Sequence, residues 1–248
     1  ITVATYLTPD RMPNLVRLVK LWRGPVSACI HLCNPVDLAE VQRQLMTVPE
    51  LRAYVTAHLL IGNTEHVPIN TMRNIAIEGV ATNWVFVLDV DSAPNAPMGQ
   101  VAADLLKARV EAEDTLYVMP CFRFRAKVDS NGVDPMFAKY LQMWPVPKAS
   151  IVELWRKGRV VPQAVKAANA SAIQLPRWMG ASIAYGVPYH ARYEPLYIAR
   201  TAAIRAVPYD ERFIGYGTNK VSHAFELWAA GWRFVALPES WGLETLNP

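Results

Sequence analysis

The chain has 248 residues, of which 52% are hydrophobic and 19% charged, and its formal net charge is +4 with an isoelectric point near 9.0. This length and composition fit one large α/β domain or two small ones. They exclude a span of about 18 uninterrupted apolar residues, a nucleic-acid patch of clustered Lys and Arg, and a zinc ribbon or thioredoxin site, since the three cysteines form no CxxC pair. The mildly basic charge is compatible with an anionic substrate.

The chain begins on the strand-like run Ile1–Leu7, without an initiator methionine or a signal-peptide pattern. We therefore expect an excised domain, and any membrane anchor would lie outside this chain.

Short apolar runs alternate with amphipathic helices through the first 88 residues. Asn34 is expected to cap the second helix, with Pro35 at its first position, and Pro68 to open the third. This alternation predicts a doubly wound, mostly parallel sheet. The predicted strands are Ile1–Leu7, Val26–Leu32, Tyr54–Gly62 and Trp84–Leu88, and the predicted helices are Asn14–Trp22, Pro35 to about Met46, and Pro68 to about Gly79.

The second half of the chain carries fewer regular patterns. Residues 126 to 176 are rich in Pro and Trp and show one short helix near Ala149–Lys157. No linker or internal repeat separates the halves, so a single domain over residues 1–248 is predicted. The other predicted helices are Pro97 to about Val110 and Asn219–Ala230, and the other predicted strands are Thr115–Phe124, Met179–Tyr185, Leu196–Ala199 and Arg233–Leu237.

The triplet Asp89-Val90-Asp91 follows the apolar run Trp84–Leu88. Such a run indicates a strand buried on both faces, and residues two apart point to the same side. Both carboxylates therefore reach the crevice past the carboxyl end of the strand, where open α/β sheets bind ligands. Two hard oxygen ligands there suit Mg²⁺ or Mn²⁺ shared with substrate phosphates. The alternative is a solvated turn or helix cap, because the triplet is short and common.

Polar side chains share one face of the preceding helix. Asn70, Arg73 and Asn74 fall at positions i, i+3 and i+4. Arg offers a fork that suits phosphate or carboxylate, and Asn reads a base or a sugar hydroxyl. The alternative is a solvated helix face.

Two glycines, Gly215 and Gly217, lie just before the helix that starts at Asn219. A bare loop at a helix N-terminus lets backbone N–H groups approach an anion or a sugar. The alternative is a loop that only caps the helix.

At these places the sequence resembles the LARGE-type and β-1,4-glucuronyltransferase family of glycosyltransferases, which is similar to glycosyltransferase family 49. The Gly-Tyr-Gly-Thr-Asn-Lys-Val-Ser-His stretch is the most diagnostic part. The resembling stretches are residues 68–76, 87–94, 193–199 and 210–227, in the order of the family.

The resemblance implies a GT-A fold, a UDP-sugar donor, Mn²⁺ or Mg²⁺, and an inverting transfer to a glycan acceptor in the Golgi lumen. Glucuronic acid is the expected sugar. By the same resemblance, Asp89 would lie near the ribose and the metal, Asp91 would bind the metal, and Arg73 and Asn74 would touch the donor, with Asn70 beside them. Residues 1–125 would form the half that binds the nucleotide sugar, and residues 126–248 the acceptor-binding half.

One position departs from the family pattern. Glu244 falls where family members carry a metal-binding His. A carboxylate also binds Mn²⁺, but it adds negative charge near a diphosphate. Three interpretations stay open: Glu244 is a metal ligand, the ligand lies elsewhere, or the metal site is weakened.

An inverting transfer needs a base for the acceptor hydroxyl. Where many GT-A enzymes carry that base, this chain has Asn219 and Lys220. Lys220 is instead expected to pair with a phosphate or a donor carboxylate. Glu194 is the first candidate base and Asp210 the second, although Glu194 equally fits a structural ion pair.

Two other functions remain open on the sequence alone. One is a non-catalytic GT-A domain that binds a glycan or a partner enzyme, which the Glu at position 244 favours. The other is a GT-A transferase that uses UDP-linked glucose, galactose, xylose or N-acetylglucosamine.

Overall fold

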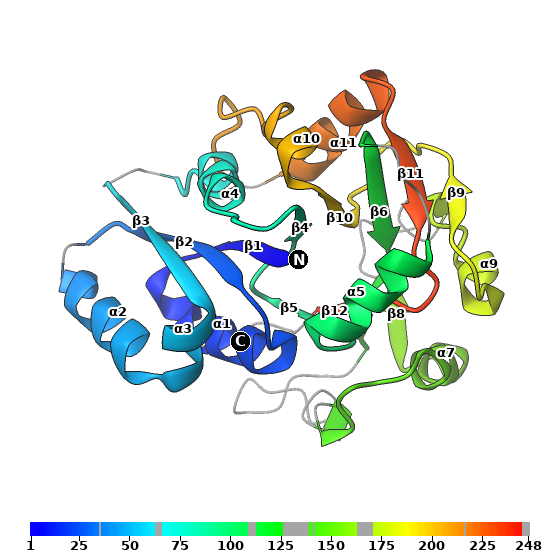
Figure 1. The fold of residues 1–248 in the computed structure, drawn as a ribbon, viewed down its shortest axis with the longest axis horizontal. Helices are drawn as coiled ribbons and strands as arrows, with labels where there is room; N and C mark the ends of the chain where they lie inside the picture. Colours follow the sequence, from blue (N-terminus) through cyan, green and yellow to red (C-terminus); the bar gives the residue numbers. More distant parts are fainter. Residues whose placement is uncertain are drawn as a thin grey trace.

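The computed structural model describes residues 1–34, 36–62, 66–108, 113–125, 139–140, 142–162, 171–215 and 217–244. Two β-sheets form its frame, and helices cover both faces of the larger one (Figure 1). Within this part of the chain, every helix is too short or too polar to cross a bilayer.

The main sheet has eight strands in the described residues, in the order β3-β2-β1-β4-β10-β6-β11-β9. Six run in one direction, while β10 and β9 run against their neighbours. The predicted mostly parallel sheet is thus confirmed, with two antiparallel strands in its second half. Its strands are β1 (Thr2–Leu7), β2 (Val26–Leu32), β3 (Val55–Ile61), β4 (Trp84–Val87), β6 (Thr115–Met119), β9 (Tyr185–Val187), β10 (Leu196–Arg200) and β11 (Arg233–Ala236).

Alternate side chains of each central strand enter different cores, as the pleat of a strand requires. In β4, Phe86 packs with the helices of one face, whereas Val85 and Val87 pack with those of the other. The first face carries α1 (Met12–Trp22), α2 (Val36–Thr47), α3 (Pro49–Tyr54) and α5 (Met98–Lys107), and the second carries α4 (Ile69–Glu78), α10 (Thr201–Arg205) and α11 (Asn219–Ala229).

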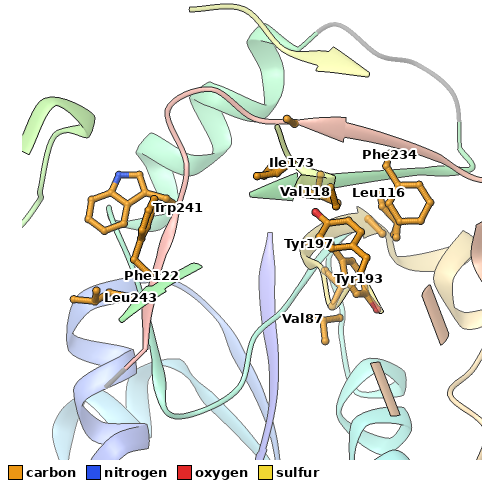
Figure 2. Packing of buried hydrophobic residues seen from close by; sticks show 14 of the residues in the cluster. Val87, Leu116, Val118, Phe122, Ile173, Tyr193, Tyr197, Phe234, Trp241 and Leu243 are labelled. Atoms are coloured by element: carbon orange, nitrogen blue, oxygen red, sulfur yellow. The ribbon is translucent and has the colours of Figure 1, made fainter. Parts of the chain in front are cut away.

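A smaller sheet of four strands, in the order β5-β12-β7-β8, packs beside the main one. Its core is aromatic. The ring of Phe122 lies 6.0 Å from that of Trp241 (Figure 2) and 5.9 Å from that of Trp178, measured between ring centroids. The strands are β5 (Ser92–Pro94), β7 (Cys121–Phe124), β8 (Val160–Pro162) and β12 (Gly242–Glu244), and the helices α7 (Lys148–Arg156) and α9 (Leu175–Gly180) precede and follow β8 in the chain.

Three short connections lead from the main sheet into the small one. The chain passes from β4 to β5 through residues 88–91, from β6 to β7 at Pro120, and from β11 to β12 through residues 237–241. The Asp-x-Asp triplet is therefore one of these crossings.

Several predicted elements need correction. The single strand predicted for Thr115–Phe124 is wrong, because Pro120 divides it into β6 and β7 in different sheets. The strand predicted for Met179–Tyr185 is also wrong. Met179 belongs to α9, which starts with Pro176 in its first turn and buries Trp178. Helix α1 begins at Met12, two residues before the predicted start.

Other predicted elements hold, with ends shifted by one or two residues. Asn34 caps α2, since its Oδ1 accepts a hydrogen bond from the backbone N–H of Val36 at 3.0 Å. The predicted position of Pro35 and the predicted helix end at Val110 lie outside the described residues.

Candidate functional site

A cavity of about 480 Å³ opens at the carboxyl ends of β1 and β4, where the sheet rule places ligands. It collects residues from six separate parts of the chain, including the start of α11 and the end of β12. Its described lining consists of Tyr6, Arg11, Ile69, Arg73, Asp89, Asp91, Ser92, Glu194, Gly217, Thr218, Asn219, Lys220 and Glu244.

A smaller cavity of about 180 Å³ adjoins the first one on the side of β1. Asp89 and Asp91 line both cavities. The additional walls of the smaller cavity are mostly apolar and come from Leu7, Thr8, Val67 and Val90. The pair of cavities thus offers a charged compartment next to a more apolar one.

Asp89 is held between two cations. Its Oδ2 pairs with the ammonium of Lys220, and its Oδ1 lies 3.4 Å from Nη2 of Arg73. Burial on its own would raise the pKa of Asp89, but Lys220 and Arg73 together outweigh it and hold that pKa at about 2. Asp89 is therefore a permanent carboxylate at neutral pH.

Arg73 is fixed by a buried aromatic cage. Its guanidinium lies 4.8 Å from the ring centre of Tyr6 and 5.2 Å from that of Tyr209. Nη2 also donates to the Tyr6 hydroxyl at 3.1 Å. Tyr209 in turn stacks on His223, with ring centres 3.8 Å apart. Stacking on aromatic faces suits a guanidinium, so the cage positions Arg73 toward Asp89.

Asp91 lies on the side of the cavity next to Arg11 and α1. Its Oδ1 accepts hydrogen bonds from Nδ2 of Asn14 at 2.6 Å and Nη1 of Arg11 at 3.3 Å. Its side chain keeps 29% of its surface exposed. Asp91 is thus oriented by α1 and the turn before it, and it still reaches the open cavity.

Glu244 is brought to the same place by strand pairing. In the antiparallel pair of β12 with β5, Glu244 lies opposite Ser92, the residue after Asp91. Both carboxylates line the larger cavity. Sequence positions 153 apart therefore meet at one end of the small sheet.

The donor set fits a hard divalent cation. In the described part of the chain, no three His, Cys, Asp or Glu side chains lie close enough to enclose a metal ion by themselves. Mg²⁺ is usually bound by one or two carboxylates together with waters and substrate phosphates, so it needs no all-protein cage. Asp91 and Glu244 offer two such oxygen donors. Asp89, in contrast, is paired with Arg73 and Lys220.

Glu194 lies on the wall formed by the second half of the chain. Burial raises the pKa of Glu194; Lys220 opposes this shift and Asp89 adds to it. A carboxyl group with a raised pKa in a cavity is suited to proton transfer.

The other sequence candidates connect segments instead of lining this cavity. Both amide atoms of Asn74 bind the backbone of Tyr209, with Nδ2 donating at 2.9 Å and Oδ1 accepting at 2.9 Å. Nδ2 of Asn70 donates to the backbone carbonyl of Asp210 at 2.7 Å. The Asp210 carboxylate is paired with Arg212. These contacts fasten α4 to the segment that leads into α11.

Tyr6, Arg11 and Asn14 belong to the site but were not singled out from the sequence. A signal was available, since Tyr6 lies near the carboxyl end of the first predicted strand, the edge at which Asp89 was expected. Asn14 and Arg11 gave no such signal, because their role follows from how α1 packs beneath the triplet.

The described lining residues carry four carboxylates and three cations. When all are ionised, the cavity has one net negative charge. An anionic ligand would therefore meet a nearly balanced site, which a bound divalent cation would make positive.

Comparisons with known proteins give a consistent result. A family model described as glycosyl-transferase for dystroglycan matches residues 61–243. The glycosyltransferase-like protein gnt14 of Dictyostelium discoideum is 27% identical over 253 residues, which cover 100% of this chain and 37% of that protein. The xylosyl- and glucuronyltransferase LARGE2 of Rattus norvegicus is 29% identical, with 98% of this chain and 34% of that protein covered. For LARGE1 of Homo sapiens the identity is 26%, and the coverages are 97% and 30%. The chain thus spans about a third of the length of these relatives.

Among solved structures, the crystal structure of GalNAc-T7 with UDP, GalNAc and Mn²⁺ superposes with a TM-score of 0.59. The match covers 98% of this chain and 43% of that chain at 12% sequence identity. It shows a shared fold, and the expected GT-A fold is confirmed.

Proposed function

The chain belongs to the family of glycosyl-transferases for dystroglycan, and from this premise we propose that it transfers a sugar from a UDP-sugar to a glycan acceptor with inversion at the anomeric carbon. The observation that carries the proposal is the cavity in which Asp91 and Glu244 face Lys220, Arg73 and Glu194. It combines oxygen donors for a cation, positive groups for a diphosphate, and a carboxyl group for proton transfer.

The charge of the cavity supports metal dependence. With one net negative charge, the lining would repel a diphosphate, and two unit charges about 4 Å apart interact by roughly 4 kcal/mol at an effective dielectric constant of 20. A Mn²⁺ or Mg²⁺ ion held by Asp91 and Glu244 would supply the missing positive charge to the leaving diphosphate.

The other residues of the two cavities have separate roles in this proposal. The smaller cavity beside Tyr6 and Val67 has the apolar walls that a nucleoside needs. Lys220 and Arg73 keep Asp89 ionised and add positive charge beside the phosphates. Glu194 takes the proton from the acceptor hydroxyl, which attacks the anomeric carbon from the face opposite UDP. Under this scheme the first half of the chain supplies most of the donor site, to which the second half adds Lys220 and Glu244, and the second half binds the acceptor.

For the donor we favour UDP-glucuronate. Lys220 and Arg73 share one carboxylate partner, Asp89, so this group of three keeps one positive charge that a donor carboxylate would use on the sugar side. Two of the relatives are named xylosyl- and glucuronyltransferases, so glucuronate is one of the two sugars in their names. The family resemblance adds the Golgi lumen as the proposed location.

Calorimetry with UDP in the presence and absence of Mn²⁺ tests the site, and a hydrolysis screen over UDP-sugars tests the donor. We expect binding of UDP that depends on Mn²⁺ and the fastest hydrolysis with UDP-glucuronate. Loss of UDP binding in all metal conditions would contradict the enzyme proposal and favour a non-catalytic glycan-binding domain. Preference for another UDP-sugar would change only the donor.

A further inference from the structure

The larger, charged cavity and the smaller, more apolar one share a boundary. Five described residues line both cavities, and Arg11 is the only cation among them. Arg73 and Lys220 belong to the described lining of the larger cavity alone. The residues of the boundary are Tyr6, Arg11, Ile69, Asp89 and Asp91.

In the proposed function, this boundary is the place that a diphosphate must occupy. The two phosphates are the only link between the nucleoside and the sugar of a UDP-sugar. With the nucleoside in the smaller cavity and the reacting sugar in the larger one, the diphosphate crosses from one to the other. At the boundary it meets the carboxylates of Asp89 and Asp91, which repel it, and the guanidinium of Arg11, which attracts it.

The three cations of the site are held to different degrees. The side chains of Arg73 and Lys220 are only 6% and 22% exposed, and both pair with the same carboxylate. The side chain of Arg11 is 34% exposed, and its Nη1 lies 3.3 Å from Oδ1 of Asp91. Its Nε pairs at 3.0 Å with Asp10, which is 68% exposed. Ion pairs in contact with solvent contribute little stability, so Arg11 can change partners at a small cost.

The backbone at Arg11 is held independently of its guanidinium. Arg11 ends the short 3-10 helix η1 (Pro9–Arg11), which lies between β1 and α1. Its backbone N–H donates to the carbonyl of Thr8 at 2.9 Å. The turn therefore does not depend on which anion the side chain contacts.

The orientation of Asp91 has a second support besides Arg11. Nδ2 of Asn14 donates to Oδ1 of Asp91 at 2.6 Å. Asn14 is held in turn by Arg17, whose Nη2 donates to its Oδ1 at 2.9 Å. Arg17 is absent from the described lining of both cavities, so it lies outside the path of a ligand. Asn14 can thus keep the carboxylate in place after Arg11 has left it.

We infer that Arg11 is a diphosphate-binding residue that exchanges partners when the donor binds. Its guanidinium leaves Asp91 and donates to the diphosphate, and the carboxylate of Asp91 becomes available to the divalent cation that accompanies the diphosphate. The inference rests on the proposed function, which makes a UDP-sugar the first substrate. The planar guanidinium presents several N–H donors that match the oxygens of a phosphate.

The exchange has a consequence for the order of affinities. Without an anion beside it, Arg11 neutralises Asp91 and disfavours a divalent cation there, because like charges repel. A phosphate that draws Arg11 away removes this effect. Metal and nucleotide should therefore each strengthen the binding of the other, as linkage requires.

The test is calorimetry on the purified chain and on Arg11→Gln, with Mn²⁺ alone, UDP at saturating Mn²⁺, and uridine as titrants. We expect Arg11→Gln to bind UDP roughly tenfold more weakly, through loss of a charge-assisted hydrogen bond to phosphate. It should bind Mn²⁺ alone about threefold more tightly, because a positive charge beside Asp91 is gone. Uridine, which carries no phosphate, should bind both proteins equally. A merely structural role would weaken the binding of Mn²⁺ and UDP together.

Two further variants complete the series. Arg11→Lys keeps the charge and loses the planar fork, so its UDP affinity should fall between those of the unaltered chain and Arg11→Gln. Arg52→Gln removes an exposed cation of α3 outside the described lining of both cavities, and it should match the unaltered chain in all three titrations. Should Arg11→Gln not fold, Arg11→Lys decides: a UDP affinity equal to that of the unaltered chain would overturn the exchange.

The outcomes separate the inference from the proposed function. Absence of UDP binding by the unaltered chain in every metal condition would sink the proposed function. Binding of UDP by the unaltered chain, with the same affinity in Arg11→Gln, would overturn the exchange and leave the proposed function standing. Unchanged or weaker binding of Mn²⁺ alone by Arg11→Gln would also overturn it, and would make Arg11 only a support for Asp91.

Discussion

Glu244 lies directly opposite Ser92 in the antiparallel pair of β12 and β5, and Ser92 follows Asp91 in the chain. Opposed residues in such a pair have Cβ atoms about 4.5–5.5 Å apart. The strand register therefore delivers the carboxylate at position 244 to the Asp-x-Asp triplet without any sequence proximity.

This register predicts the effect of Glu244 substitutions on metal binding. Glu244→Gln should weaken Mn²⁺-dependent UDP binding by about tenfold or more, because an amide is a poorer ligand than a carboxylate. Glu244→His should retain most of the affinity. Calorimetric titration of UDP at fixed Mn²⁺ measures both, with Glu239→Gln as a control on an exposed carboxylate outside the cavity. Unchanged affinity in Glu244→Gln would remove Glu244 from the metal site.

The ion pair of Asp89 predicts an acid-dependent loss of stability. Its pKa is about 2 in the folded chain and 3.8 ordinarily, so the unfolded state binds the proton first as the pH falls. The lowered pKa of Asp89 adds about 2 kcal/mol to the free energy of unfolding above pH 4, and this contribution disappears as the pH falls through 2. Urea unfolding of the unaltered chain and of Asp89→Asn, from pH 7 to pH 2, should show a stability gap that narrows below pH 4. A gap independent of pH would contradict this assignment.

The position of Glu194 predicts its role in catalysis. Glu194→Gln should lower kcat by about 10²–10⁴-fold, the usual loss when a positioned general base is removed. UDP affinity should stay the same. In the unaltered enzyme, kcat should rise with pH along a limb centred above 4.5, because burial raises the pKa of Glu194 and only its ionised form accepts the proton.

Asp210→Asn is the matched control for Glu194, since Asp210 is paired with Arg212 and does not belong to the described lining of the cavity. We expect its kcat to change far less. If Asp210→Asn loses transfer while Glu194→Gln keeps it, the two roles are reversed.

His223 predicts a second pH effect at milder acidity. Its ring is buried against Tyr209, and burial lowers its pKa to about 4 from an ordinary value of 6.5. The unfolded state therefore binds a proton between pH 6.5 and 4 that the folded state does not. The free energy of unfolding should have its full value above pH 6.5 and should fall by about 3 kcal/mol as the pH decreases to 4. His223→Phe should flatten the dependence in urea unfolding, whereas His190→Gln, which alters an exposed imidazole, should leave it unchanged.

The sequence predicted the parallel half of the fold because its strands are long apolar runs and its helices have clear apolar faces. It missed β5, β8 and β12, each of three residues, which exist only through pairing with distant partners and carry no periodicity of their own. Pro120 interrupts a continuous apolar pattern, and the pattern alone gave no sign that the two pieces enter different sheets.

For the candidate site, residues next to the ends of predicted strands and at the start of a predicted helix were the most predictable. Asp89, Asp91, Glu194, Lys220 and Glu244, all named from the sequence, line one cavity. Asn74 and Asp210 have the chemistry of binding residues, but their side chains are used on contacts with the segment around Tyr209 and Arg212. Such contacts join positions more than 130 residues apart or lie on a loop, so no local pattern distinguishes them from ligand contacts.

The three crossings from the main sheet into the small sheet have a consequence for how such a site changes over evolutionary time. Asp91 and Glu244 belong to the small-sheet side of the crossings, whereas Asp89 and Lys220 belong to the main-sheet side. Repacking the aromatic core around Phe122 and Trp241 would shift the carboxylates of Asp91 and Glu244 relative to the ion pair of Asp89 and Lys220. In the proposed site, metal preference is therefore a property that selection can adjust from a distance, through residues that do not contact the ion, while the proposed nucleotide side stays as it is.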